Sequence, residues 1–230
     1  MNHRLSIIIP TFNEAANLES ILSALMPMQA RGAEIIVVDG GSDDETLIIA
    51  TRQADQALDS PRGRAVQMNT GAAAATGDVF FFLHADSLPP TNADQSILQA
   101  LFTGIHCWGR FDVRISGTGV MLPAVAALMN RRSRMTGIAT GDQGIFMTRA
   151  AFAAIDGFAL IPLMEDVAAS RALKHLGRPA CLREKMQTSG RRWEKHGVLK
   201  TIVLMWGLRA AYFFGANPRA LAHRYHDHKD

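Results

Sequence analysis

Cysteine and long uncharged apolar runs are both scarce in this chain of 230 residues. The two cysteines, Cys107 and Cys181, are far apart and lack the spacing of metal ligands, which indicates a reduced, cytosolic compartment. No uncharged apolar stretch reaches the roughly 18 residues that span a bilayer. The apolar run before Pro10 is too short for a secretory leader, so we expect no signal peptide. We therefore expect a cytoplasmic protein, either free or bound peripherally at the inner face of the membrane.

Excess charge is also modest. The formal net charge is +3 at pH 7 and the isoelectric point is about 9.1, which is too little to indicate a nucleic acid partner. The excess is uneven, because nine lysines and arginines but only two glutamates lie between residues 171 and 200. This basic segment predicts an anionic ligand or an anionic membrane surface.

The apolar pattern predicts an α/β fold. Short buried strands alternate with helices in the first part of the chain, which favours a largely parallel sheet with helices on both faces. The composition shows no repeat and no break, so we expect one domain over 1–196, followed by an amphipathic helix and a polar tail over 197–230. Strands are expected at 5–9, 35–38, 79–83, 109–115 and 144–147, and helices at 14–26, 46–54, 64–75, 94–102, 120–135 and 165–176.

Polar side chains follow three predicted strands at the point where each strand ends. Ligands in open α/β sheets bind at these carboxyl ends, so the polar residues there are candidates for a phosphate or metal site. Each also has a plainer interpretation, as a helix cap, a turn residue or a solvated charge. The candidates are Pro10, Thr11, Asn13 and Glu14 after the first strand, Asp39 at the second, and His84 and Asp86 after the strand at 79–83.

Two arginines begin the predicted helix at 64–75. Arg62 and Arg64 place positive charge at the end of the helix whose dipole is itself positive. Such cations either are an ordinary solvated pair or have an anionic partner, such as a diphosphate or a nearby carboxylate.

Two common nucleotide-binding patterns are absent. The chain has no glycine fingerprint after its second strand, which disfavours a nicotinamide cofactor. The segment after the first strand, PTFNEAANLE, lacks the glycine-rich, arginine- and lysine-containing loop of many nucleotidyltransferases.

Four segments together resemble the family 2 glycosyltransferases of the GT-A fold. They are SIIIPTFNE at 6–14, EIIVVDGGSDDET at 34–46, GDVFFFLHAD at 77–86 and MED at 164–166. The resemblance spans residues 4 to 195. It implies one Rossmann-like α/β domain that transfers a sugar from a nucleotide-sugar with inversion, commonly with Mn²⁺ or Mg²⁺.

The resemblance also implies roles for individual residues. Asp39 faces the base of a nucleotide that we expect to be UDP, and Asp86 is the metal-binding end of the family's DxD motif. Asp166 is the general base that deprotonates the acceptor hydroxyl. The other implied contacts are Pro10, Thr11, Asn13, Glu14, Arg64, Arg191 and Arg192 for the donor nucleotide, and Asp142, Gln143 and Glu165 for the acceptor.

His84 departs from the family pattern, because an acid usually stands at the first position of DxD. A neutral imidazole suits Mn²⁺ better than Mg²⁺, which prefers oxygen ligands. Two interpretations stay open. His84 is either a metal ligand or a hydrogen-bonded neighbour of a metal held by Asp86 and the diphosphate.

Two alternatives to a sugar transferase also stay open. One is a catalytically silent nucleotide-sugar-binding protein, and the other is a nucleotidyltransferase. The sequence does not indicate which sugar is moved, or whether the acceptor is a small molecule or lipid-linked. The apolar face of the helix at 197–214 is expected either at a membrane interface or packed on the domain or a partner subunit, which leaves a homo-oligomer open.

Overall fold

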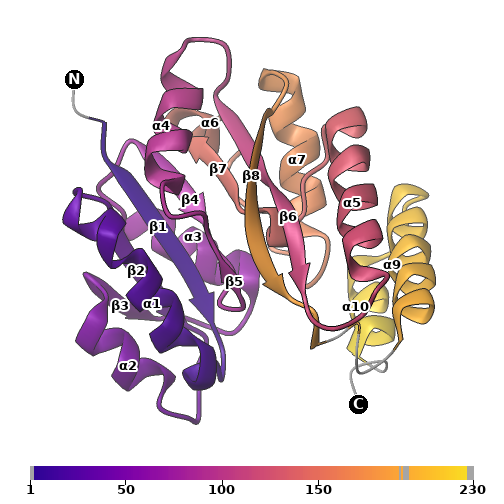
Figure 1. The fold of residues 1–230 in the computed structure, drawn as a ribbon, viewed down its shortest axis with the longest axis horizontal. Coiled ribbons are helices and arrows are strands. Elements are labelled where there is room, and N and C mark those ends of the chain that lie inside the picture. Colours follow the sequence, from indigo (N-terminus) through magenta and orange to yellow (C-terminus); the bar gives the residue numbers. More distant parts are fainter. Residues whose placement is uncertain (1–2, 192, 194–196, 227–230) are drawn as a thin grey trace.

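Eight strands form one curled sheet in the order β3-β2-β1-β4-β7-β6-β8-β5, with helices on both faces (Figure 1). The computed structural model describes residues 3–191, 193 and 197–226. The elements are β1 (Leu5–Thr11), α1 (Ala15–Ala30), β2 (Glu34–Asp39), α2 (Thr46–Gln53), β3 (Gln56–Asp59), α3 (Arg64–Ala74), β4 (Val79–Phe82), β5 (Ser87–Leu88), α4 (Ala93–Phe102), β6 (Trp108–Ser116), α5 (Leu122–Thr136), η1 (Gly141–Gln143), β7 (Ile145–Thr148), α6 (Arg149–Ala154), α7 (Glu165–Leu176), β8 (Ala180–Ser189), α9 (Val198–Phe213) and α10 (Pro218–His226).

The sheet is mostly parallel, as the sequence predicts. β1 pairs in parallel with β2 and β4, β2 with β3, and β6 with β8. β7 is antiparallel to both β4 and β6, and β5 is antiparallel to β8. Only residues 83–86 separate β4 from β5, although β5 stands at the far end of the strand order, so the sheet curls back and brings β5 and β8 near the end of β4 (Figure 1). The segment 83–86 carries His84 and Asp86.

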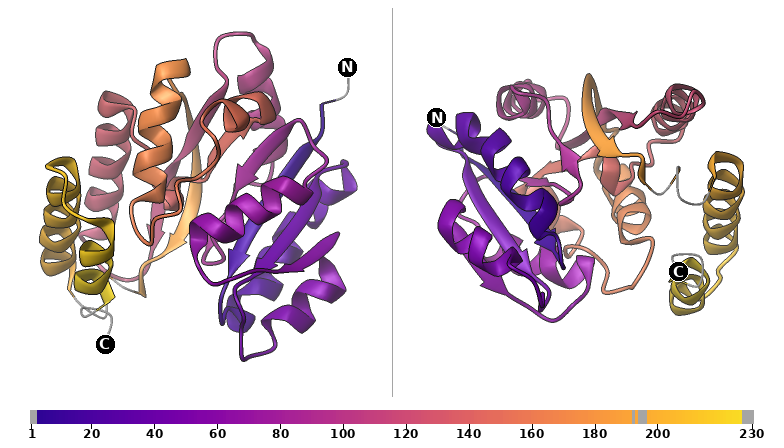
Figure 2. Two further views of the ribbon diagram at one scale, coloured as in Figure 1. Left: turned by 180° about the vertical axis from the view of Figure 1, so that it is seen from behind. Right: turned by 60° about the horizontal axis from the view of Figure 1, so that its bottom comes forward.

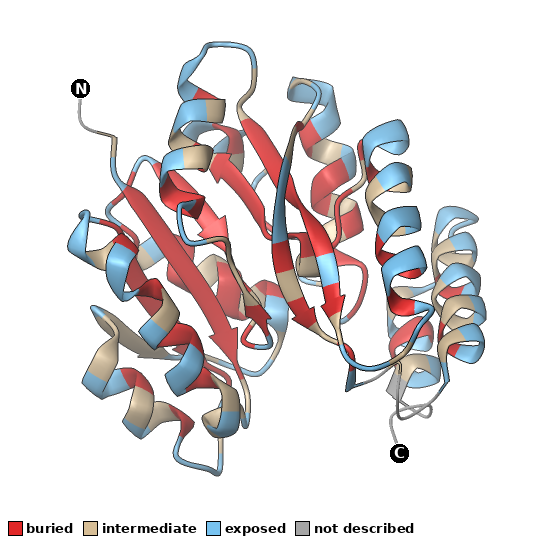
Figure 3. Ribbon diagram, viewed as in Figure 1, coloured by how far each residue is buried: buried red, intermediate tan, exposed pale blue. Residues whose placement is uncertain are grey.

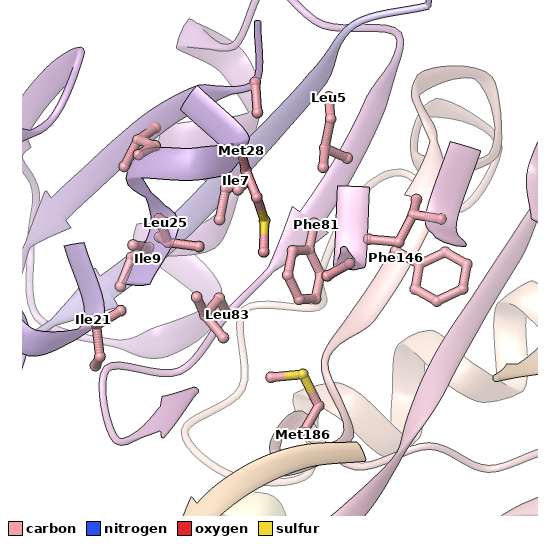
Figure 4. Packing of buried hydrophobic residues seen from close by; sticks show 14 of the residues in the cluster. Leu5, Ile7, Ile9, Ile21, Leu25, Met28, Phe81, Leu83, Phe146 and Met186 are labelled. Atoms are coloured by element: carbon pink, nitrogen blue, oxygen red, sulfur yellow. The ribbon is translucent and has the colours of Figure 1, made fainter. Parts of the chain in front are cut away.

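Alternate residues of the central strands fill two separate cores. Ile7 and Ile9 of β1 pack with α1 and α4 on one face, where Phe81 and Met28 also lie (Figure 4). Ile8 points to the opposite face and packs with α3 and α7. Because both faces are covered, these strands read as continuous apolar runs rather than as an alternating pattern. The sheet interior is the most completely buried part of the chain (Figure 3).

Pro10 does not end β1, contrary to the expectation that it stops the first strand. The strand continues to Thr11, and Pro10 stands opposite Val38 of β2. The pairing of β1 with β4 ends at Ile8, so no neighbouring carbonyl on that side requires the amide hydrogen that proline lacks.

Helix α3 approaches the sheet very closely at Gly71. A Cβ atom at this position would lie 2.5 Å from Cγ2 of Ile8 and 3.1 Å from Cγ2 of Val38. We therefore expect Gly71→Ala to destabilise the protein by about 1–3 kcal/mol, although alanine has the better helix propensity, because the core must move to accept the methyl group. Urea unfolding measures this, with Ala73→Gly on the same helix as a propensity control. A Gly71→Ala variant as stable as the parent would contradict the close approach.

Helices α9 and α10 form a hairpin at one end of the molecule (Figure 2). Leu208 and Leu221 of the hairpin pack with Leu163, Met164 and Val167, which lie just before and within α7. Ile202 packs with the cluster that joins β6 and α5. In the described part of the chain, no helix is both long and apolar enough to cross a membrane.

Candidate functional site

The loops after β1 and β2 are tied to each other by their own side chains. Asn13 adopts a left-handed conformation with φ 53°, and its Oδ1 accepts the backbone N–H of Asp43 at 2.9 Å. The N–H of Asn13 donates to the Ser42 hydroxyl at 2.8 Å. Neither Thr11 nor Asn13 caps α1, since that helix begins after Glu14 with no side-chain cap. The polar residues at this strand tip therefore hold the loop in place rather than the helix end.

Asp39 is buried within its own turn. Its Oδ2 accepts the backbone N–H groups of Gly41 and Ser42 at 3.0 and 2.7 Å, and its Oδ1 accepts the Thr11 hydroxyl at 3.3 Å. In these contacts Asp39 stabilises its own turn, which is the plainer of the two roles that the sequence allows. The Ser42 hydroxyl also donates to Oδ1, so each carboxylate oxygen already accepts two donors, which is the number of its lone pairs. The expected contact with a base stays a prediction.

Arg64 has a carboxylate partner from a distant part of the chain. Its Nε lies 2.9 Å from Oε1 of Glu165, whose side chain is only 3% exposed. This ion pair joins the start of α3 to the start of α7, and it offsets the unfavourable position of a cation at a helix N-terminus. Arg62, in contrast, stacks over the ring of Phe12 at 3.8 Å from its centroid. Of the two arginines, Arg64 is the one that reaches the cleft.

Three possible metal ligands converge beside the loop after β4. His84, Asp86 and Asp142 each offer a ligand atom, and these atoms all lie within 4.8 Å of one another. His84 Nδ1 is 3.6 Å from Oδ1 of Asp142. The sequence predicted Asp86 and His84 as the metal pair but assigned Asp142 to the acceptor. The structure instead brings Asp142 to the other two, because η1 folds against the β4–β5 segment.

Gly141 is required for that arrangement. A Cβ atom there would lie 2.0 Å from Cε1 of the His84 ring, which is far closer than atoms can approach. The imidazole thus occupies the space that any other residue at 141 would fill. Burial and the charge of Arg64 lower the pKa of His84, but the hydrogen bond that its ring donates to Asp142 and the charges of Asp142 and Asp86 outweigh them and raise that pKa.

Asp166 lies at the first turn of α7 and faces the same cleft. Its Oδ2 accepts the backbone N–H of Gly141 at 3.0 Å, and its Oδ1 accepts that of Val167 at 2.7 Å. Burial and the neighbouring charge of Glu165 raise the pKa of Asp166, while Arg64 and the two N–H groups oppose the rise. A carboxylate with a raised pKa is a better proton acceptor than an ordinary aspartate.

The remaining predicted site residues lie in different parts of the structure. Gln143 is buried and accepts the backbone N–H of Thr140 at 3.2 Å, so it holds the η1 turn. Arg191 lines the cleft, and its Nε donates to the Ser189 hydroxyl at 3.1 Å. Arg192 lies outside the described residues. Pro10 and Glu14 stay at the β1 tip, where the N–H of Glu14 donates to the Thr46 hydroxyl at 2.9 Å.

Arg132 belongs to the site but is not among the residues predicted from the sequence. It projects from α5 into the wall of the cleft, and burial lowers its pKa despite the charge of Asp166 nearby. Its Nε and Nη2 are buried and have no hydrogen-bond partner among the described residues. An arginine in a predicted helix carries no signal of this kind, because the signal comes from the packing of α5 against α7 and β6.

These groups border one open cleft of about 600 Å³. Asp86, Asp142 and Asp166 supply negative charge, and Arg64, Arg132 and Arg191 supply positive charge. The arrangement can hold a divalent cation, neutralise an anionic leaving group and accept a proton within one cleft.

Comparisons with known proteins point to one family of enzymes. The family model described as glycosyl transferase family 2 matches residues 6–160. The PGL/p-HBAD biosynthesis glycosyltransferase of Mycobacterium tuberculosis is 39% identical over 108 residues, which are 44% of this chain and 42% of that protein. The dolichol-phosphate mannosyltransferase of Pyrococcus furiosus is 31% identical over 108 residues, covering 44% of this chain and 31% of that protein. These matches thus cover less than half of each relative.

Two solved structures have a similar fold. Glucosyl-3-phosphoglycerate synthase from M. tuberculosis, in complex with Mn²⁺, UDP and its product, has a TM-score of 0.60 and 20% identity, covering 81% of this chain and 71% of that chain. S. aureus TarS 1–349 in complex with UDP has a TM-score of 0.66 and 17% identity, covering 81% of this chain and 60% of that chain. At these identities the likeness concerns the fold.

Proposed function

Because the chain belongs to glycosyl transferase family 2, we propose that it transfers a sugar from a nucleotide-sugar to an acceptor hydroxyl, with inversion and with the help of a divalent cation. The observation that carries this proposal is the meeting of Asp166, Arg64 and the cluster of His84, Asp86 and Asp142 at one cleft. An acid with a raised pKa, an anion-binding guanidinium and a metal-binding set are the parts that such a transfer requires.

The donor nucleotide is proposed to lie over the tips of β1 and β2, with UDP favoured. The loop held by Asn13 and Ser42 gives this surface a fixed shape. Asp39 would face the base by exchanging one of its hydroxyl donors, Thr11 or Ser42, for a donor of the base. Arg64 and Arg191 would lie toward the diphosphate. The structures of TarS and of glucosyl-3-phosphoglycerate synthase were both solved with UDP, which supports this choice.

The metal-binding set fits a divalent cation. One imidazole and two carboxylates lie close enough to share an ion, and Gly141 leaves the space that the imidazole needs. When bound, Mn²⁺ or Mg²⁺ would neutralise charge on the departing diphosphate. The imidazole favours Mn²⁺, and the two carboxylates alone would also accept Mg²⁺.

The protein residues divide the remaining work. Asp166 accepts the proton of the acceptor hydroxyl on the face of the sugar opposite to the leaving group. The N–H groups of Gly141 and Val167 fix its two oxygen atoms, so the carboxylate is oriented before the acceptor arrives. Arg64 is held in place by its ion pair with Glu165, and its positive charge would stabilise the negative charge that develops on the diphosphate.

Calorimetry with nucleoside diphosphates tests the donor. We expect UDP in the presence of Mn²⁺ to bind at least about tenfold more tightly than GDP or ADP, a difference of about 1.4 kcal/mol, because Asp39 would select the base. Equal affinities would refute the role of Asp39 but not the fold. Turnover of UDP-sugars, detected as UDP release, then separates a transferase from a silent binding protein. A chain that binds UDP-sugars and never releases UDP, with any acceptor, would contradict the proposed activity.

We also propose that α9 contacts a membrane surface from the cytoplasmic side. Leu199, Val203, Trp206 and Phe213 form an exposed apolar stripe on this helix, with 66%, 72%, 64% and 69% of each residue exposed. The segment 197–226 contains Lys200 and several arginines but no acidic residue, which suits anionic lipids. Sedimentation with vesicles tests this contact, and we expect binding to phosphatidylglycerol vesicles that weakens at high salt. A protein that stays in the supernatant under all conditions contradicts the proposal.

A further inference from the structure

The cleft has a second, apolar half that the proposed sugar transfer does not use. Its polar end holds Asp166 and the metal-binding set. Beyond them the lining changes to apolar side chains from three separate elements and the segment that follows β8. These include Val125 and Met129 of α5, Met164 beside α7, Met205 and Trp206 of α9, and Trp193.

A nucleotide-sugar has no part that matches this wall. Its base, ribose, diphosphate and sugar are all polar, and they are expected over the tips of β1, β2 and β4. The apolar lining residues come mainly from α5 and α9. These helices lie at the opposite end of the molecule from β1 and β2 (Figures 1 and 2). A ligand of these apolar side chains must therefore enter from the acceptor side, and it must itself be largely apolar.

The wall suits a flexible occupant. Met129, Met164 and Met205 have polarisable, unbranched side chains that adapt to irregular apolar shapes. The hairpin contributes Trp206, which lines the cleft and yet is 64% exposed. The cleft thus opens at Trp206, which also belongs to the exposed stripe of α9. An apolar chain longer than the cleft can leave it there without meeting a polar surface.

Arg132 of α5 also lines the cleft, close enough to Asp166 for their charges to interact. Its Nε and Nη2 lack hydrogen-bond partners among the described residues, and burying such donors without an acceptor is unfavourable. An oxygen-rich head group beside Asp166 would supply the missing acceptors. Arg131 and Arg209 also line the cleft, and they favour a head group that is polar or negative over one that is positive.

We propose that the acceptor is an amphiphile, with a hydroxyl-bearing head at Asp166 and an apolar tail between α5 and α9. This inference rests on the proposed function, because it identifies the class of molecule that receives the sugar. It selects the lipid-linked acceptor over the small polar acceptor that the sequence left open.

The test uses a series of probes with one head and different tails. Butyl, hexyl and octyl β-glucosides are titrated by calorimetry below their micellar concentrations, in the presence of UDP and Mn²⁺. We expect Kd to fall by two- to fourfold for each added methylene group, the upper value being the transfer free energy of one CH₂. Butyl, hexyl and octyl phosphates, measured in parallel, show whether a charged head binds more tightly than a hydroxyl head.

Two variants of α9 locate the tail. Trp206→Ala removes part of the cleft wall, and we expect it to weaken octyl glucoside by at least about tenfold while butyl glucoside changes little. Val203→Ala is the matched control, because it truncates an equally exposed apolar residue on the same helix that does not line the cleft. Affinity that does not depend on tail length overturns the inference. Equal losses of octyl glucoside affinity in the two variants also overturn it, since the tail would then lie on the exposed face of α9 and not in the cleft.

The donor side is measured separately in the same variants, so that the two proposals fail in different ways. UDP affinity does not involve the tail, and UDP release from UDP-sugars is measured with each alkyl glucoside in turn as the acceptor, at saturating concentration. If both are normal and the tail has no effect, the amphiphilic acceptor is wrong and the transferase stands. If tail length matters but no nucleotide-sugar is bound or turned over, the cleft holds an apolar ligand that is not an acceptor, which overturns this inference together with the proposed function.

Discussion

Asp166→Asn is expected to lower sugar transfer by about 10²–10⁴-fold, the usual contribution of a general base, while UDP binding stays within about twofold. The amide keeps the shape of the carboxylate, and its oxygen can still accept the N–H of Gly141. It cannot accept a proton from the acceptor hydroxyl. Transfer is measured as UDP release with acceptor present, and binding is measured by calorimetry.

Asp156→Asn is the matched control for this variant. Asp156 is exposed, lies away from the cleft lining and has φ 56°, a conformation that asparagine tolerates well. We expect its activity to equal that of the parent. Turnover of Asp166→Asn close to the parent value, with a verified acceptor, would remove Asp166 from the role of base.

The pH dependence of transfer gives an independent check on Asp166. Burial and the charge of Glu165 raise its pKa, and a general base works only when it is unprotonated. Activity is therefore present above this raised pKa and is lost as the pH falls through it. Glu165→Gln removes the neighbouring negative charge and frees Arg64 to approach Asp166, so the pKa should fall and the acidic limb of the profile should move to lower pH. If the acidic limb of the Glu165→Gln profile stays in place or moves to higher pH, a group other than Asp166 controls the loss of activity at low pH.

Asp86→Ala is expected to lower transfer by about 10²-fold or more, because the cation contributes several kcal/mol to stabilising the leaving group. Removal of metal with EDTA should have the same effect on the parent and little further effect on the variant. Glu184→Ala serves as the control, since it removes an exposed carboxylate outside the cleft. Full activity of the parent in EDTA, restored by no added metal, would contradict a metal-assisted transfer.

Metal titrations of His84→Ala and Asp142→Ala then distinguish the ligands. The ligand atoms of His84, Asp86 and Asp142 lie close together, but without nucleotide they provide few of the ligands that Mn²⁺ or Mg²⁺ normally has. We therefore expect weak Mn²⁺ binding alone and much tighter binding with UDP. His84→Asp should improve Mg²⁺ affinity by supplying an oxygen ligand. Tight Mn²⁺ binding without nucleotide that disappears in His84→Ala would instead make the imidazole a principal ligand.

The regular elements were the most predictable part of this fold. The apolar runs around Ile7, Ile36 and Phe81 are buried on both faces, so composition alone reveals them as central strands. β8 was not predicted, because Arg183, Glu184 and Lys185 interrupt its buried pattern; it pairs with β6 and leaves these three residues exposed. The basic segment at 171–200 predicts an anionic ligand or membrane surface, but three of its charged residues, Arg183, Glu184 and Lys185, form the solvated surface of β8.

The site was predictable only in part, for a different reason. Strand-tip residues such as Asp39 and Asp86 follow from local pattern, because parallel strands present their carboxyl ends on one edge. The pairing of Arg64 with Glu165 and the approach of Asp142 to His84 join segments that are far apart in the chain. No local pattern encodes such contacts, since they depend on how α7 and η1 pack on the sheet.

The short turn η1 connects two groups for which we propose roles toward different substrates. Asp142 is one of the three candidate metal ligands, and the adjacent Gly141 donates its N–H to Asp166, the proposed base. Anything that shifts this turn when donor and cation bind also changes the orientation of the carboxylate that meets the acceptor. By thermodynamic reciprocity, a second substrate that favours the same turn conformation must tighten the first. We expect steady-state kinetics of an ordered type, with nucleotide-sugar and cation on the enzyme before the acceptor and with little wasteful hydrolysis of the donor in its absence.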